Sequence, residues 1–155
     1  KEEVHNQRKH FPSRICIEDF REINGWLLNA KRRQRQDLQK MFHSSWSFDL
    51  ISEHDEYWTD ELESQANCAE RGYKGLLWLK DRDEDKIMVV SHGGILRFCM
   101  LDHPNVVVID GRPDDEKRFG NCELREYEMT WEHHGSDGLE GSDDRPIVTL
   151  TEVKS

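Results

Sequence analysis

The sequence has few apolar residues for its length. Of its 155 residues, 35% are hydrophobic and 35% are charged, whereas ordinary globular domains hold about 45–50% apolar residues when glycine is counted. The length fits one domain. We therefore predict a single domain over residues 1–155. Its low apolar content indicates either that much of the chain is solvated loop or that part of the core lies in polypeptide outside this sequence.

Long hydrophobic runs, paired cysteines and an initiator methionine are also lacking. No apolar run approaches the roughly 18 residues that suggest a membrane-spanning helix. The four cysteines are widely spaced, with no Cys-x-x-Cys pair and no secretory signal, a pattern typical of reduced thiols in the cytoplasm. The charged opening KEEVHNQRKHFPSR does not begin with methionine, so we expect the chain to come from a longer protein.

Basic residues are outnumbered, with 22 against 32 acidic ones and a net charge of −10. This balance argues against nucleic acid or a membrane surface as the partner. An anionic substrate would then need a local basic pocket. The run AKRRQR, which contains Arg32 and Arg33, is a candidate for such a pocket; the alternative is a solvated helix start.

Apolar spacing predicts three helices and several strands. The clearest helix covers residues 60–80, with Asp60 and Glu63 as a capping box at its start; the others cover residues 34–43 and 95–101. A continuous apolar run predicts a strand buried on both faces at residues 87–90. The other predicted strands are residues 14–20, 106–110, 122–131 and 146–153, the last two forming an antiparallel edge pair around a flexible loop, residues 132–145.

This order of helices and strands predicts an α/β fold. We expect a three-layer architecture with a mostly parallel sheet, helices on both faces and an antiparallel edge. In such sheets, ligands bind beyond the carboxyl ends of the strands. The end of the strand predicted at residues 87–90 is therefore the first place to search for a site.

The stretch KIMVVSHGGILRFCM places His92 at this position, between an apolar run and a helix pattern. Gly93 and Gly94 allow the backbone to turn sharply and to approach a ligand closely. A histidine there can donate a hydrogen bond to a phosphate oxygen or transfer a proton. The alternative is a buried histidine that bonds a neighbouring carbonyl group.

The same stretch resembles the second histidine motif of the histidine phosphatase superfamily, the phosphoglycerate mutase-like proteins. EDFREINGW resembles the family segment with an acidic site residue, which corresponds to Glu22. RFGNCELREYEM resembles the Asn-Cys-Glu strand near the family's end. ELESQANCAERG matches the family at Glu63, Ser64, Arg71 and Gly72. The resemblance runs from about residue 15 to residue 129.

The resemblance implies roles for several residues. His92 would bind and stabilise the transferring phosphoryl group, assisted by the backbone N–H groups of Gly93 and Gly94. Glu22 would protonate the leaving alkoxide and later activate water. The substrate would be a small phosphorylated metabolite, and the family needs no metal or cofactor. Arg21, Arg32 and Arg33 are candidates to lie near the substrate.

One other group of residues invites a metal interpretation. His133 and His134 stand close in sequence to Asp137 and Asp143. Adjacent histidines rarely bind the same ion, so we predict no metal site there.

The sequence departs from the family at one decisive point. The Arg-His-Gly motif, whose histidine is the nucleophile and whose arginine binds the phosphate, is absent. RKHF at residues 8–11 has no apolar strand before it and does not replace the motif. We therefore expect the chain to hold the C-terminal part of the domain and to be inactive alone. A phosphomonoester hydrolase, a phosphoglycerate mutase-type phosphotransferase and a catalytically inactive ligand-binding protein all remain open.

Overall fold

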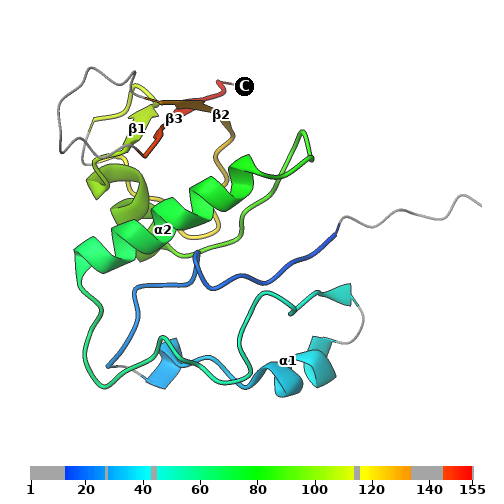
Figure 1. The fold of residues 1–155 in the computed structure, drawn as a ribbon. Coiled ribbons are helices and arrows are strands. Elements are labelled where there is room, and N and C mark those ends of the chain that lie inside the picture. The colour runs from blue at the N-terminus through cyan, green and yellow to red at the C-terminus, as the bar shows by residue number, and fades with distance from the viewer. Residues whose placement is uncertain (1–12, 27, 43–44, 114–115, 134–144, 155) are drawn as a thin grey trace, which may run out of the picture. The chain divides into compact units, whose positions relative to one another are not determined.

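The computed structural model describes residues 13–26, 28–42, 45–113, 116–133 and 145–154. The chain forms two compact units: the first consists of Lys1–Glu18 and Arg32–Glu56, and the second of Asp19–Lys31 and Tyr57–Ser155. The second unit contains both His92 and Glu22, so it determines what the site can be. Figure 1 shows the elements of both units.

The longest helix, α2, covers Gln65–Lys80 in the second unit. Its N-cap is Ser64, whose side chain accepts a hydrogen bond from the Asn67 N–H group at 3.1 Å. The predicted start at Asp60 and its capping box with Glu63 are therefore wrong. A serine hydroxyl is among the best N-cap acceptors, and Glu63 is engaged elsewhere, in an ion pair with Arg71.

A second helical segment follows His92. Helix α3 covers Gly93–Arg97 and continues directly into η3, a π-helical turn over Phe98–Asp102. Both pack on α2, where Gly72 faces Cys99 so closely that a Cβ atom at residue 72 would overlap it. The predicted helix at residues 95–101 is confirmed, and its packing depends on a small residue in α2.

Three strands form a mixed sheet in the order β1-β3-β2. Strands β1 (Val106–Ile109) and β3 (Ile147–Glu152) are parallel, and β2 (Tyr127–Glu132) pairs with β3 in antiparallel fashion. The register aligns Val106 with Val148, and both side chains are buried. The predicted strand at residues 106–110 is confirmed. The antiparallel edge pair is confirmed as well, except that residues 122–126 of its first predicted strand do not belong to β2.

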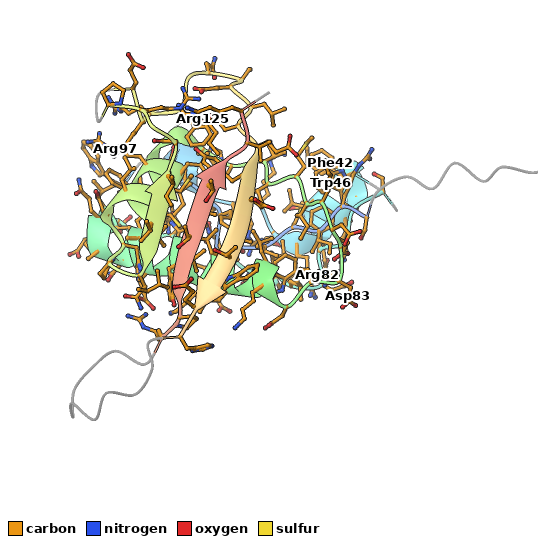
Figure 2. The ribbon with its side chains drawn as sticks, turned by 90° about the horizontal axis from the view of Figure 1, so that it is seen from above. Phe42, Trp46, Arg82, Asp83, Arg97 and Arg125 are labelled. Atoms are coloured by element: carbon orange, nitrogen blue, oxygen red, sulfur yellow. The ribbon has the colours of Figure 1, made fainter. Side chains whose placement is uncertain are left out.

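The two faces of this sheet differ. Val148 and Leu150 point to a buried face, whereas Val107 and Ile109 on the opposite face are exposed. Figure 2 views the sheet from above, with the helices of the second unit behind it. The α/β class is thus confirmed, but in the described part of the chain we do not observe a three-layer arrangement with helices on both faces.

Two predicted strands do not form. Residues 87–90 pair with no strand among the described residues, and their side chains are exposed: Ile87 42%, Met88 75%, Val89 38% and Val90 83%. Of residues 14–20, Ile15 forms an isolated bridge with Ser47 and nothing longer. An apolar run supplies strand propensity, but a strand also needs a partner for its N–H and C=O groups.

The first unit contains helix α1, Arg35–Phe42, which confirms the helix predicted at residues 34–43. Phe48 and Ile51 are buried. The rings of Phe42 and Trp46, labelled in Figure 2, meet edge to face with centroids 6.4 Å apart. This unit therefore builds its small apolar cluster from aromatic side chains and loops.

None of the helices in the described part of the chain is long and apolar enough to cross a membrane. The loop predicted at residues 132–145 and the RKHF segment lie largely or wholly outside the described residues. The single-domain prediction for residues 1–155 stays a prediction.

The four cysteines are unpaired and differ in accessibility, which predicts their reactivity. Burial raises the pKa of Cys68 to about 11 and that of Cys99 to about 12, whereas Cys122 is exposed. Because the thiolate is the reactive form, we expect iodoacetamide at pH 8 to alkylate Cys122 first. Peptide mapping by mass spectrometry should find Cys68 and Cys99 modified only after denaturation; their modification in the native protein would contradict the packing of α2 on η3.

Candidate active site

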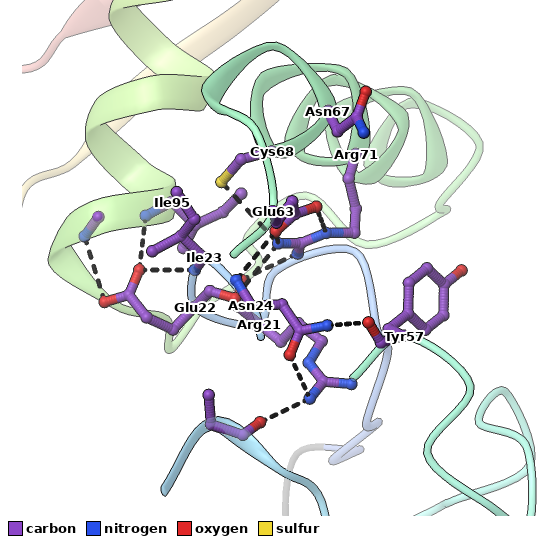
Figure 3. A network of polar contacts seen from close by, with 12 residues as sticks. Arg21, Glu22, Ile23, Asn24, Tyr57, Glu63, Asn67, Cys68, Arg71 and Ile95 are labelled. Carbon is purple, nitrogen blue, oxygen red and sulfur yellow. Dashed lines mark hydrogen bonds and ion pairs between the residues drawn. The ribbon is translucent and has the colours of Figure 1, made fainter. Parts of the chain in front are cut away.

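Glu22 lies against the chain that follows His92, although 70 positions separate the two residues in the sequence. Its Oε1 atom accepts hydrogen bonds from the N–H groups of Ile23 and Ile95, each at 2.9 Å, and Oε2 accepts one from Gly94 at 3.3 Å. Figure 3 shows the carboxylate between its own loop and the start of α3. The fold therefore places the Glu22 carboxylate against the backbone two and three residues beyond His92.

These three bonds orient the carboxylate. A carboxylate oxygen has about two lone-pair positions, and Oε1 uses both on main-chain N–H groups. Oε2 accepts one bond from the described residues. Oε2 is consequently the oxygen with capacity for a further partner.

A second bond connects the two segments on the other side of His92. The Ser91 hydroxyl donates to the Phe20 carbonyl group at 2.6 Å. Residues 91 and 94–95 are thus both fastened to the loop that carries Glu22, which we call the Glu22 loop and define as residues 19–24. His92 is held between these attachment points.

His92 itself is exposed and is the N-cap residue of α3, with extended backbone angles (φ −127°, ψ 155°). Its side chain forms no cap hydrogen bond within the described chain. The alternative considered from the sequence, a buried histidine bonded to a neighbouring carbonyl, does not describe this exposed side chain. An imidazole in this position is open to a ligand from solvent.

The two glycines after His92 have different surroundings. A Cβ atom at Gly94 would overlap the Glu22 carboxyl group, whereas one at Gly93 would meet nothing nearer than the Phe119 carbonyl oxygen at 4.0 Å. The Gly94 N–H group already donates to Glu22. Gly94 therefore makes room for the carboxylate, and Gly93 is the glycine whose backbone faces open space.

The arginines predicted near the substrate are committed to other contacts. Arg21 donates to the Ala30 carbonyl group at 2.7 Å and to the Asn24 side chain at 3.3 Å. Arg32 pairs with Glu18 at 2.6 Å and donates to the Ser52 and His54 carbonyl groups. Arg32 and the exposed Arg33 belong to the first unit, so their proximity to a substrate stays a prediction.

No group of three or more potential metal ligands occurs among the described residues. Of the four residues considered for a metal site, His133 is described, and His134, Asp137 and Asp143 are not. The geometry of the described site is instead that of a carboxylate, an exposed imidazole and main-chain N–H groups.

Similarity to known proteins extends over most of the chain. The chain is 37% identical over 120 residues to phosphoglycerate mutase-like protein 1 of Arabidopsis thaliana. The matched stretch covers 74% of this chain and 41% of that protein. The chain is 34% identical over 82 residues to phosphoglycerate mutase-like protein 2 of the same plant, covering 52% of this chain and 24% of that protein. The chain is thus similar in sequence to two proteins named phosphoglycerate mutase-like.

The resemblance inferred from the sequence motifs is thus confirmed at this level. The chain spans less than half the length of either curated relative it matches. No protein-family model matches the chain, and no solved structure matches it.

The different surroundings of the two glycines predict opposite results for the same substitution. Gly94→Ala should lower the free energy of unfolding by about 1–3 kcal/mol, because an added methyl group in a filled space forces its neighbours to shift. Gly93→Ala should change it by less than about 0.5 kcal/mol, as is usual for exposed positions. Urea denaturation of both variants measures the difference. Equal effects would show that the Glu22 carboxylate does not lie over Gly94.

Proposed function

We propose that this chain is the C-terminal part of a histidine phosphatase domain that hydrolyses small phosphomonoesters through a phosphohistidine intermediate. The observation that carries the proposal is the contact of the Glu22 carboxylate with the backbone two and three residues beyond His92. The homology to phosphoglycerate mutase-like proteins supports it. The resemblance supplies the roles of the two residues, and the contact between their segments is what the structure adds.

In the first step, a nucleophilic histidine from polypeptide outside this sequence attacks the phosphorus atom. The bond from phosphorus to the ester oxygen breaks, and Glu22 gives its proton to the departing alkoxide. His92 donates a hydrogen bond from a ring N–H group to a phosphoryl oxygen and stabilises the charge that develops there. Without a proton donor, an alkoxide is a poor leaving group, so the rate of this step depends on Glu22.

In the second step, the Glu22 carboxylate takes a proton from water. The water oxygen attacks the phosphorus atom of the phosphohistidine, and the phosphorus–nitrogen bond breaks. This step releases inorganic phosphate and regenerates the histidine side chain. The Gly93 backbone is close to the phosphoryl group in this arrangement. The Gly94 N–H group serves the site differently from the sequence-based expectation, because it orients Glu22.

The exposed run at residues 87–90 fits this proposal. We propose that it pairs with the strand that carries the Arg-His-Gly motif, which would complete a mostly parallel, three-layer sheet and place the nucleophile beside His92. More than half of the length of each curated relative lies outside its match to this chain. That length is ample for such a strand, and pairing would cover the four exposed apolar side chains.

A second candidate function is binding of a phosphorylated ligand without turnover. It is favoured by the absence of Arg-His-Gly from the 155 residues. A phosphotransferase of the mutase type, favoured by the names of the two relatives, differs in one respect: the phosphoryl group passes to a second hydroxyl group instead of to water.

The central test uses the protein expressed from the complete coding sequence and p-nitrophenyl phosphate as substrate. We expect hydrolysis, and we expect His92→Ala to lower kcat by about 10²–10³, as removal of one charge-stabilising donor usually does. His133→Ala is the matched control, because His133 is exposed at the end of β2, and it should keep the wild-type rate. An unchanged rate in His92→Ala would refute the role of His92.

The alternatives give other results. Release of inorganic phosphate identifies a hydrolase, whereas transfer to an added alcohol in preference to water identifies a phosphotransferase. Shifts of the His92 ring resonances on addition of inorganic phosphate, without turnover by the complete protein, identify a binding protein. Turnover by the 155-residue chain alone would show that the nucleophile lies within it.

A further inference from the structure

The Glu22 loop contains no regular secondary structure. Three of its carbonyl groups nevertheless accept hydrogen bonds from one buried side chain. Arg71, on α2, donates to the carbonyl groups of Asp19 at 3.0 Å, Arg21 at 2.9 Å and Glu22 at 3.3 Å. Figure 3 shows the guanidinium group pointing from the helix into this loop. A buried backbone carbonyl without a partner is costly. This one side chain supplies the hydrogen bonds that a neighbouring strand would supply in a sheet.

The same guanidinium group also pairs with Glu63. Its Nε atom donates to Glu63 Oε1 at 3.0 Å and its Nη2 atom to Oε2 at 2.7 Å. A guanidinium group has five N–H donors in a fixed plane. Here they serve the two carboxylate oxygens, the three carbonyl groups and, at 3.8 Å, the Cys68 sulfur atom. A lysine ammonium group has three donors at a single atom and cannot form this set.

Glu63 fastens the far end of the loop. Its Oε2 atom accepts from the Asn24 N–H group at 3.1 Å, and its own N–H group donates to the Asn24 carbonyl group at 2.7 Å. The backbone is thus held at residues 19 to 22 by Arg71 and at residue 24 by Glu63. Glu22 lies between these anchors, and its carboxylate can reach Gly94 and Ile95 only while the loop keeps this path.

We propose that Arg71 is a positioning residue which, together with Glu63, holds the Glu22 carboxylate against the start of α3. The geometric part of the proposal stands on the contacts alone. Its catalytic part, that Arg71 thereby sets the rate of proton transfer by Glu22, rests on the proposed function. Arg71 does not touch the substrate in this role; it acts through the main chain of the Glu22 loop.

The test is Arg71→Lys, with Arg82→Lys as the matched control. Arg82 follows the end of α2 and forms an exposed bidentate pair with Glu84 at 3.0 and 2.8 Å; Figure 2 labels it next to Asp83. The readout is the pH dependence of the amide resonances of Gly94 and Ile95 by NMR. These amides respond to protonation of Glu22 because they donate to its carboxylate, and Glu22→Gln defines the response that remains without it.

We expect Arg71→Lys to reduce this pH response by at least half and Arg82→Lys to leave it unchanged. In the complete protein, we expect Arg71→Lys to lower kcat at least about 10-fold, since small displacements of a catalytic group are costly. KM should change less than about twofold, because Glu22 acts in proton transfer and not in substrate binding. Wild-type amide response in a folded Arg71→Lys variant would overturn the proposal.

Two further outcomes are separable. If Arg71→Lys does not fold, the test uses Glu63→Gln instead. This change keeps the volume of the side chain and one oxygen acceptor. A full amide response in the Glu63→Gln variant would overturn the proposal. If the amide response is lost but the complete protein hydrolyses no phosphomonoester, the positioning role stands and the proposed function fails.

Discussion

The arrangement of the site depends on the hydrogen bonds of one buried guanidinium group. Arg71 connects α2 to three carbonyl groups of a loop that lacks secondary structure and to the carboxylate of Glu63. Breaking a buried ion pair by removing one partner usually costs about 3–5 kcal/mol, because the other charge is left without compensation. By contrast, exposed pairs such as Arg82 with Glu84 usually contribute about 0–1 kcal/mol. The number of ion pairs is therefore a poor guide to stability. What matters is which arginines also donate to main-chain carbonyl groups.

A second arginine that pairs with a carboxylate and donates to main-chain carbonyl groups occurs in another segment without regular secondary structure. Arg125 pairs with Glu123 at 2.6 Å and donates to the carbonyl groups of Lys117 and Arg118 at 2.9 and 2.7 Å. Its contact lowers the pKa of Glu123 to about 2. Since the ordinary value is higher, this stabilisation is present at neutral pH and is lost only as the pH falls toward the lowered value. Arg32 plays a comparable part in the first unit, with Glu18 as its carboxylate.

These arginine contacts help to explain why the chain has many charged residues and few apolar ones. A chain with 35% hydrophobic residues has limited apolar area with which to hold its loops in place. Arginines fasten them instead, because one guanidinium group satisfies several carbonyl groups and a carboxylate at once. The high charged fraction is thus partly structural. Arg21 and Arg32 illustrate this, because each donates to main-chain carbonyl groups.

Local patterns in the sequence predicted the elements that local forces determine. The apolar spacing in α2 and the alternation in β2 and β3 are visible without the fold, and the parallel strand β1 followed from its valines. The start of α2 was misplaced because Asp60 and Ser64 are both good caps, and the ion pair of Glu63 decides between them. The proximity of Glu22 to His92 came from family resemblance, since no spacing rule joins residues 70 positions apart. The structure also reveals Arg71, which the resemblance matched without assigning a role.

The failure at residues 87–90 has a different cause, and it bears on how the site works. Their sequence is that of a buried strand, but burial needs a neighbour on each side, and these residues pair with none in the described chain. Ser91 and Gly94 are nevertheless tied to the Glu22 loop, so the turn around His92 is held from the Glu22 side while the strand before it is not held by a sheet. Arg71 and Glu63 can therefore keep the acid in place before any partner strand is present. In the proposed enzyme, the proton donor and the phosphate-binding histidine would be assembled within this chain, and pairing at residues 87–90 would add the nucleophile to a site that is already oriented.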